Sequence, residues 1–322
     1  MMNKFLDKLE LLSPAGSFEC AKAAIDAGAD AIYMGGAKYG ARAFAKSTSD
    51  NSIIDTIKFV KENGKKFYLT VNTLFKQREL KEIFLFLDPI VDVGVDAFIV
   101  QDLGVAMLLK SKYPNVELHA STQMTITSSK AINLIKALGF TQVVLARELS
   151  IKEIKAIKKE IGDDIKLEAF VHGSMCYSYS GACLMSSFIG GESGNRGRCK
   201  GPCRLPYRRG ELHEPSNRRG ELHEPAPYIL SMKDMCALNS LSGLINAGVT
   251  SFKIEGRMRQ ADYVYGVTKT YRKYLDSITH EPDIKKDEQY LLQLYNKGGF
   301  TNYYDFHNNP DMIQRYERKK KK

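Results

Sequence analysis

The 322-residue sequence has no tryptophan, only six cysteines and no long apolar run. Six cysteines are too few for the disulfide framework of a small secreted protein. Without an apolar run of about 18 residues, no membrane-spanning helix is expected. The charged stretch from Met1 to Glu10 lacks the apolar centre of a secretory signal. These absences favour a cytoplasmic, globular protein with no membrane partner.

The net charge of +10 is concentrated at one end of the chain. Arg315 to Lys322 hold six basic residues and one acidic residue, which together give half of that charge. Such a tail is usually solvated, and contact with nucleic acid is the alternative. The 17 tyrosines and 15 phenylalanines are scattered rather than interleaved with basic residues as in an RNA-binding module.

One pattern recurs four times: a helical stretch ends at a glycine, and an apolar strand follows. The glycines are Gly28, Gly94, Gly139 and Gly248. A glycine just past a helix end allows a tight turn into the next strand. Further strands are expected over Leu9 to Ser13, Phe67 to Asn72, Glu117 to Ser121 and Lys166 to His172, with helices over Ile53 to Asn63, Glu79 to Val93, Lys130 to Leu138 and Ile151 to Ile161.

Eight apolar strands that alternate with helices predict a parallel sheet covered on both faces. A (β/α)8 TIM-type barrel is the favoured α/β fold, and a doubly wound open sheet is the alternative. We expect the barrel over residues 1–276 and a C-terminal extension with a basic tail over 277–322. Several strands end in polar side chains, and barrel active sites form at these carboxyl ends.

The connection after the seventh strand is abnormally long. About 75 residues separate His172 from the strand near Ser251, where a few would suffice. This insertion, residues 173–250, includes an octapeptide at 208–215 that is repeated at 218–225. It also holds five of the six cysteines, so we expect a long loop with a cysteine cluster at the barrel mouth.

The clustered cysteines are Cys176, Cys183, Cys199, Cys203 and Cys236. Clustered thiols in a reducing compartment suggest a metal or redox role. Only Cys199 and Cys203 form the tight pair that is usual in zinc sites, whereas iron–sulfur clusters tolerate varied spacing. A 4Fe-4S cluster is therefore favoured, with zinc and unligated thiols as alternatives. We favour Cys176, Cys183, Cys199 and Cys236 as ligands, with Cys203 as the alternate.

Around these cysteines the sequence resembles peptidase family U32. The stretch from Glu168 to Ser186 looks like that family's signature, and the resemblance extends over roughly residues 8 to 305. It implies either a collagenase-like peptidase or an iron–sulfur enzyme that hydroxylates RNA pyrimidines at C5 with prephenate; other members support ubiquinone hydroxylation. Cys203 to Tyr207 and Leu230 to Asp234 look most like the ribosomal RNA cytidine hydroxylase branch, with the transfer-RNA uridine branch close behind.

A peptidase needs a nucleophile and a base, and His172 with Cys176 is the available pair. No Gly-x-Ser-x-Gly or His-Glu-x-x-His motif occurs, and Cys176 is better explained as a metal ligand. RNA hydroxylation is therefore the favoured function and proteolysis the alternative. A non-catalytic iron–sulfur partner protein is the second alternative, because the resemblance also implies that some members act with a homologous partner subunit.

The hydroxylase interpretation assigns roles to strand-end residues. Prephenate has two carboxylates, which Arg147, Lys253 and Arg257 are suited to bind. Gln101 and Gln123 are candidates for reading a base edge.

Glu168 and His172 lie four residues apart on one strand, so their side chains are expected to face the same way. They are candidates for a proton-handling pair, with Glu255 as a further catalytic candidate. A structural pair across the barrel interior, and a Glu255–Arg257 ion pair, are the alternatives.

RNA, ribosomal or transfer, is the expected macromolecular partner, bound through phosphate contacts. The candidate cations are Arg196, Arg198, Lys200, Arg204, Arg208, Arg209, Arg218, Arg219 and the tail from Lys319 to Lys322.

Overall fold

The computed structural model describes residues 9–36, 38–41, 50–207, 228–276, 283–304 and 312–313. The duplicated octapeptide and the basic tail, including their arginines and lysines, lie outside these residues. The described strands form one ten-stranded sheet.

Eight parallel strands of this sheet close into a barrel. Closure depends on β9, which pairs in parallel with β1 on one side and with β7 on the other. Phe252 on β9 lies opposite Leu11 of β1 and Ala169 of β7. The predicted (β/α)8 TIM-type barrel is confirmed. Its strands are β1 (Glu10–Pro14), β2 (Ala31–Gly35), β3 (Lys66–Val71), β4 (Ala97–Val100), β5 (Glu117–Ala120), β6 (Gln142–Val144), β7 (Lys166–Gly173) and β9 (Ser251–Ile254).

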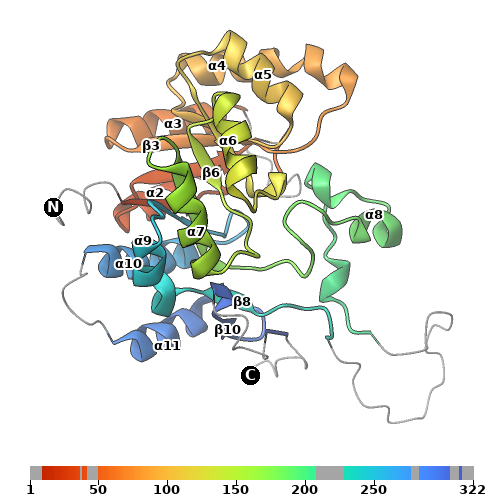
Figure 1. Cartoon of the computed structure of the whole chain (residues 1–322). Helices are drawn as coiled ribbons and strands as arrows, with labels where there is room; N and C mark the ends of the chain where they lie inside the picture. Colours follow the sequence, from red (N-terminus) through yellow and green to blue (C-terminus); the bar gives the residue numbers. More distant parts are fainter. Residues whose placement is uncertain are drawn as a thin grey trace.

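Helices connect these strands and cover the outside of the barrel (Figure 1). No helix among the described residues is long and apolar enough to span a bilayer. The helices are α2 (Phe18–Asp26), α3 (Asp50–Glu62), α4 (Ile83–Asp92), α5 (Leu103–Lys112), α6 (Ser129–Ala137), α7 (Ile151–Ile161), α8 (Met185–Gly190), α9 (Leu241–Asn246), α10 (Ala261–Asp276) and α11 (Ile284–Leu294).

Local sequence signals explain where the helices begin. The Ser150 hydroxyl accepts a hydrogen bond from the backbone N–H of Glu153, which caps α7. Ile154, Ile157 and Ile161 then recur at helical spacing and are buried. One predicted helix starts later than expected, at Ile83, because residues Gln77–Lys81 form a separate 3-10 turn.

The recurrent glycines lie at helix-to-strand junctions, as predicted. Gly28 has φ +94° and Gly94 has φ +95°, a conformation that side chains other than glycine's rarely adopt. The shared conformation explains why the sequence repeats glycine at this point of successive helix–strand units.

Neighbouring residues on each strand belong to two separate cores. Phe67 and Phe98 pack outward against the helices. The next residue of each strand, Tyr68 and Ile99, belongs to a smaller cluster inside the barrel. This alternation is the period-two pattern of a strand, and it decides which side chains reach the barrel interior.

The long connection between β7 and β9 contains two elements that position the site. These are α8 and the short strand β8 (Asp234–Cys236). β8 pairs antiparallel with the end of β7 and in parallel with β10 (Phe300–Thr301). Neither short strand was predicted, because two or three residues carry no detectable periodicity.

Beyond residue 276, α11 packs on the outer helix α10. Asp287 of α11 accepts hydrogen bonds from Lys273 Nζ at 2.7 Å and from the Tyr274 hydroxyl at 2.9 Å, both on α10. The division at residue 276 stays a prediction.

Candidate active site at the barrel mouth

A buried ion pair lies inside the barrel. Lys253 Nζ on β9 is 2.8 Å from Glu168 Oε1 on β7, and both side chains are almost wholly excluded from solvent. Gln142 Nε2 donates to the other oxygen, Glu168 Oε2, at 2.5 Å. Burial lowers the pKa of Lys253, and the negative charge of Glu168 acts in the opposite direction. Glu168 thus compensates for the cost of placing an amine at this depth.

Two aromatic rings flank the Lys253 amine. Nζ lies 4.4 Å from the centroid of the Tyr33 ring and 5.6 Å from that of Phe170. The guanidinium carbon of Arg257 lies 5.7 Å from the same Tyr33 ring, and its Nη1 donates to Thr70 Oγ1 at 2.7 Å. The structure therefore brings Lys253 and Arg257, both predicted site residues, to one ring.

Arg147 reaches the same region from the loop after β6. Its guanidinium carbon is 5.7 Å from the centroid of the Phe170 ring, and its Nη1 is 3.8 Å from Met175 Sδ. Phe170 therefore lies near both Arg147 and Lys253. The three cations predicted to bind an acid gather around two aromatic rings, which sequence reasoning did not identify as part of the site.

The two glutamines predicted to read a base edge are in contact, Gln101 through its side chain and Gln123 through its backbone. Gln101 Nε2 donates to the backbone oxygen of Gln123 at 3.4 Å. The side-chain oxygen of Gln101 is buried and has no hydrogen-bond partner among the described residues. A buried acceptor without a partner is unusual and fits a position that a ligand donor occupies. Gln101 therefore remains the better candidate of the two for base recognition.

The cysteine-rich segment is fixed to the loops that follow β5 and β6. The backbone N–H of Ser180 donates to Glu148 Oε1 at 2.7 Å. Gly181 lies so close to Gln123 that a Cβ atom there would be 2.1 Å from the Gln123 carbonyl oxygen. These contacts hold the chain between Cys176 and Cys183 over the carboxyl ends of the barrel strands.

Three of the five clustered thiols act electrostatically on a fourth, Cys203. The half-buried Cys203 has a raised pKa, chiefly because of burial. Cys176, Cys199 and Cys183 each raise this pKa further, while Arg204 lowers it. As the side chains stand, no group of three or more His, Cys, Asp or Glu in the described part of the chain is close enough together to hold a metal ion.

Cys236, the preferred fourth ligand, lies elsewhere. It is buried on β8 with an exposed fraction of 3%, and the Tyr271 hydroxyl is 3.9 Å from its sulfur. Burial raises the pKa of this thiol to about 12. Cys176, Cys183 and Cys199 thus act electrostatically on the alternate, Cys203, whereas Cys236 is enclosed in the core. The reason is the pairing of β8 with β7, which holds Cys236 in the core and which sequence spacing does not reveal.

The expectation that Glu168 and His172 face the same way is wrong. The register between β7 and β9 shifts between Phe170 and His172, so the bulge turns His172 away from the barrel interior. The His172 ring instead packs against Tyr271 and Phe300, at centroid distances of 5.6 and 5.1 Å. Burial lowers the pKa of His172 to about 3, so this side chain is neutral.

Glu255 follows β9 beside the end of β7. Its backbone N–H donates to the carbonyl oxygen of His172 at 2.8 Å. Its negative charge acts to raise the pKa of His172, against the larger effect of burial. Glu255 therefore lies beside His172, whereas Glu168 lies within the barrel.

The predicted RNA-binding cations differ in availability. Arg196 pairs with Glu79 at 2.5 Å, and Arg204 donates to Ser231 Oγ at 3.0 Å and to backbone oxygens. Arg198 is more than half exposed and lies 3.7 Å from Glu192.

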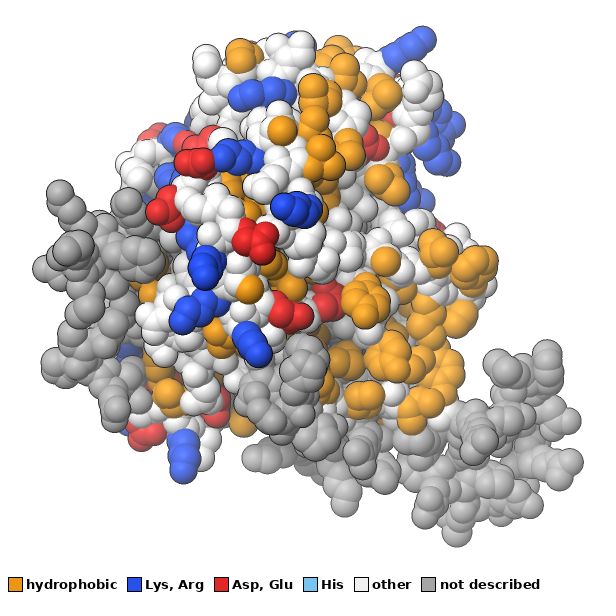
Figure 2. Space-filling view, viewed as in Figure 1, with side chains coloured by type: hydrophobic (Ala, Val, Ile, Leu, Met, Phe, Trp, Pro, Cys, Tyr) orange, Lys and Arg blue, Asp and Glu red, His pale blue; other side chains and the backbone are white. Residues whose placement is uncertain are grey.

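The surface of α8 carries an apolar patch. Leu184, Phe188 and Ile189 are exposed there, Phe188 to 82%, and Figure 2 shows hydrophobic side chains gathered in this region.

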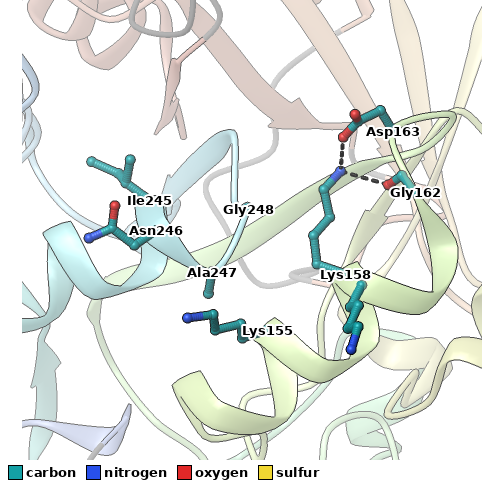
Figure 3. Close-up of a pocket in the computed structure, with 9 residues that line it drawn as sticks. Lys155, Lys158, Gly162, Asp163, Ile245, Asn246, Ala247 and Gly248 are labelled. Carbon is teal, nitrogen blue, oxygen red and sulfur yellow. Dashed lines mark hydrogen bonds and ion pairs between the residues drawn. The ribbon is translucent and has the colours of Figure 1, made fainter. Parts of the chain in front are cut away.

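A pocket of about 520 Å³ lies at the opposite end of the barrel (Figure 3). Lys155, Lys158, Asn246 and Gly248 line it, among others. Lys158 Nζ is held by Asp163 and by the Gly162 carbonyl, both at 2.8 Å. Gly162 and Gly248 precede strands, so this pocket is remote from the carboxyl ends where barrel enzymes place their chemistry.

The structure is a closed α/β barrel with a cationic, aromatic mouth beneath a cysteine-rich loop. The chain belongs to peptidase family U32, whose pattern matches residues 16–315. It is 42% identical over 274 residues to the 23S rRNA 5-hydroxycytidine synthase of Escherichia coli (strain K12). The matched region covers 85% of this chain and 40% of that protein. The chain is 36% identical over 276 residues to a tRNA hydroxylation protein of Bacillus subtilis (strain 168), covering 86% and 65%.

The chain therefore spans less than two thirds of the length of either relative. Among solved structures, that of the U32 peptidase Mk0906 is similar, with a TM-score of 0.50 and 12% identity over 77% of this chain and 93% of that one. This likeness concerns the fold alone.

The buried His172 predicts an acid-dependent loss of stability. Its pKa falls from 6.5 to about 3 on folding, so between these values the unfolded chain binds a proton that the folded protein does not. The free energy of unfolding should decrease as the pH falls through this window, by up to about 1.4 kcal/mol per pH unit from this group. Denaturant titrations of wild type and His172→Gln at neutral and acidic pH should show a shallower acid dependence in the variant. Parallel curves would contradict the assignment.

Proposed function

We propose that this protein hydroxylates a pyrimidine base of RNA at C5. The observation that carries the proposal is the 42% identity to a ribosomal RNA 5-hydroxycytidine synthase along 85% of this chain. The second relative, a tRNA hydroxylation protein, supports the same class of reaction on a different RNA. Cytidine in ribosomal RNA and uridine in transfer RNA are therefore the candidate substrates.

An acid co-substrate such as prephenate fits the cations at the mouth. Each guanidinium can bind a carboxylate through two parallel hydrogen bonds. Arg147 and Arg257 are the better carboxylate partners, because the charge of Lys253 is already balanced by Glu168 at 2.8 Å. The Tyr33 and Phe170 rings provide apolar surface for the carbon ring of such an acid.

A 4Fe-4S cluster would be held by Cys176, Cys183, Cys199 and Cys203. Four thiols are the donor set that such a cluster requires, and the effect of Cys176, Cys183 and Cys199 on the pKa of Cys203 supports the choice. When bound, the cluster would supply electron transfer. This chain's own residues would orient the acid, exclude water and hold a proton on the Lys253 amine.

Proteolysis, the activity in the family's name, is the alternative. The geometry disfavours a thiol peptidase in which His172 is the base for Cys176. The base would be His172, whose ring is enclosed by Tyr271 and Phe300. The exposed Cys176 lies in the loop beyond the bulge. A buried imidazole with a pKa of about 3 is a weak base at neutral pH.

Nucleoside analysis tests the proposed reaction. A strain that lacks this protein should lose a 5-hydroxypyrimidine nucleoside from ribosomal or transfer RNA, as measured by mass spectrometry of RNA digests. The wild-type gene should restore it. Arg257→Lys should restore it about 10- to 100-fold less efficiently, because a charged bidentate hydrogen bond is lost. Nucleosides that are unchanged in both RNA classes would contradict the proposal.

Two cysteine variants test the cluster independently of activity. Cys203→Ser, purified without air, should lose most of its iron and acid-labile sulfide. Cys236→Ser is the matched control and should retain both. The reverse result would return Cys236 to the ligand set, and wild-type protein without iron or sulfide would exclude the cluster.

A further inference from the structure

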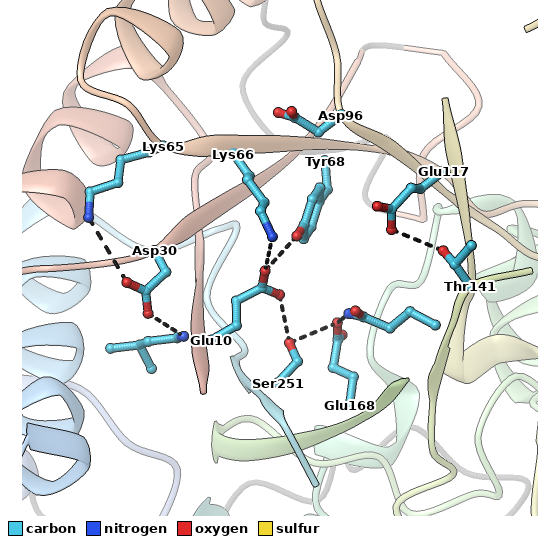
Figure 4. Close-up of polar contacts among 12 residues, drawn as sticks. Glu10, Asp30, Lys65, Lys66, Tyr68, Asp96, Glu117, Thr141, Glu168 and Ser251 are labelled. Atoms are coloured by element: carbon cyan, nitrogen blue, oxygen red, sulfur yellow. Dashed lines mark hydrogen bonds and ion pairs between the residues drawn. The ribbon is translucent and has the colours of Figure 1, made fainter. Parts of the chain in front are cut away.

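A row of polar side chains runs through the barrel from its amino end to Lys253. Glu10, Lys66 and Ser251 are the first residues of β1, β3 and β9. Lys66 Nζ is 3.3 Å from Glu10 Oε2, and the Ser251 hydroxyl is 3.0 Å from Glu10 Oε1 and 3.3 Å from Glu168 Oε2. Lys253 Nζ completes the row at 2.8 Å from Glu168 Oε1. Figure 4 shows the links from Lys66 to Glu168.

The two ends of this row differ in exposure. The Lys66 side chain is 52% exposed and that of Glu10 is 12% exposed. Ser251 is 1% exposed, and the side chains of Glu168 and Lys253 are 0% and 4% exposed. The row therefore connects solvent at the amino end of the barrel with a buried amine that faces the aromatic rings near the mouth.

Ser251 occupies the central position. Its hydroxyl has one hydrogen, yet oxygens of two carboxylates lie within hydrogen-bond distance. A hydroxyl in such a position can accept a proton on one side while it gives its own to the other. Two donors fix the carboxylates: the Tyr68 hydroxyl, 2.6 Å from Glu10 Oε2, and Gln142 Nε2, 2.5 Å from Glu168 Oε2.

We propose that Lys66, Glu10, Ser251 and Glu168 form a proton relay that connects Lys253 with solvent at the amino end of the barrel. A proton passes from the Lys66 ammonium to Glu10 and from Glu10 to the Ser251 oxygen. The Ser251 hydrogen moves to Glu168, and Glu168 reprotonates the Lys253 amine after that amine has given up a proton at the mouth. Lys66 regains a proton from water, so one proton enters for each one delivered; the reverse sequence removes one.

The use of this relay in catalysis rests on the proposed function. RNA and an acid bound at the mouth would cover Lys253 on that side. The charged groups that act on Lys253 are Glu168 and Glu10, from β7 and β1, and Arg257, which follows β9. A route from the opposite end lets Lys253 exchange protons while the mouth is occupied.

Proton exchange at Lys253 tests the relay without RNA or cofactor turnover. In full-length protein labelled with 15N-lysine, the exchange of the Lys253 ammonium hydrogens with water is measured by NMR, with Lys253→Arg used to assign the signal. Ser251→Ala should slow this exchange about 100-fold, the lower end of the contribution of a positioned proton-transfer group. Glu10→Gln should slow it similarly, because an amide cannot pass the proton on.

Two variants separate a relay from a structural network. Ser251→Thr keeps a hydroxyl and should restore fast exchange. Thr141→Val removes the 3.0 Å hydrogen bond to Glu117, at the same end of the barrel but off the row, and should leave exchange unchanged. Unchanged exchange in Ser251→Ala and Glu10→Gln would overturn the relay, as would slow exchange in Ser251→Thr with an unchanged melting temperature.

The RNA assay distinguishes this failure from failure of the proposed function. If exchange is slowed in Ser251→Ala but RNA is unmodified in the wild type, the relay is supported and the proposed hydroxylase function is ruled out. If RNA is modified in the wild type but exchange is unaltered in Ser251→Ala, the hydroxylase function is supported and the relay is ruled out.

Discussion

The pairing of β9 with both β1 and β7 is the constraint on which the site depends. This pairing closes the barrel and places Lys253 beside Glu168, two residues that are 85 positions apart in the sequence. Loss of either partner would leave an uncompensated buried charge, which typically costs about 3–5 kcal/mol. The ion pair and the closed barrel therefore support each other, and the cations at the mouth are arranged around this fixed point.

The cysteine-rich loop depends on the same frame. Ser180 is bonded to Glu148, and Gly181 lies against the Gln123 backbone, so the loop is held by the segments that follow β5 and β6. The thiols, the cations and the aromatic rings come from distant parts of the chain, yet they meet at one end of one barrel. That arrangement would suit the proposed reaction, in which an acid, an RNA base and electrons are handled together.

Much of the fold could be predicted because it depends on local patterns. Apolar runs gave the eight barrel strands, and glycines such as Gly28 marked the helix ends. Lys253 and Arg257 could be chosen because they lie near or just after the carboxyl end of a strand. The bulge before His172 could not be predicted, because it depends on register against β9. The burial of Cys236, in contrast to the half-buried Cys203, could not be predicted either. It depends on the pairing of the three-residue strand β8 with β7.

The most direct test of the account is an assay with purified protein. Protein prepared without air would be incubated with unmodified ribosomal and transfer RNA transcripts, prephenate, a peptide substrate and an added two-electron oxidant such as dioxygen. Both RNA nucleosides and peptide fragments would be measured by mass spectrometry. The account predicts a pyrimidine nucleoside that has gained one oxygen atom, with the peptide intact. Cleaved peptide with unmodified RNA would contradict it.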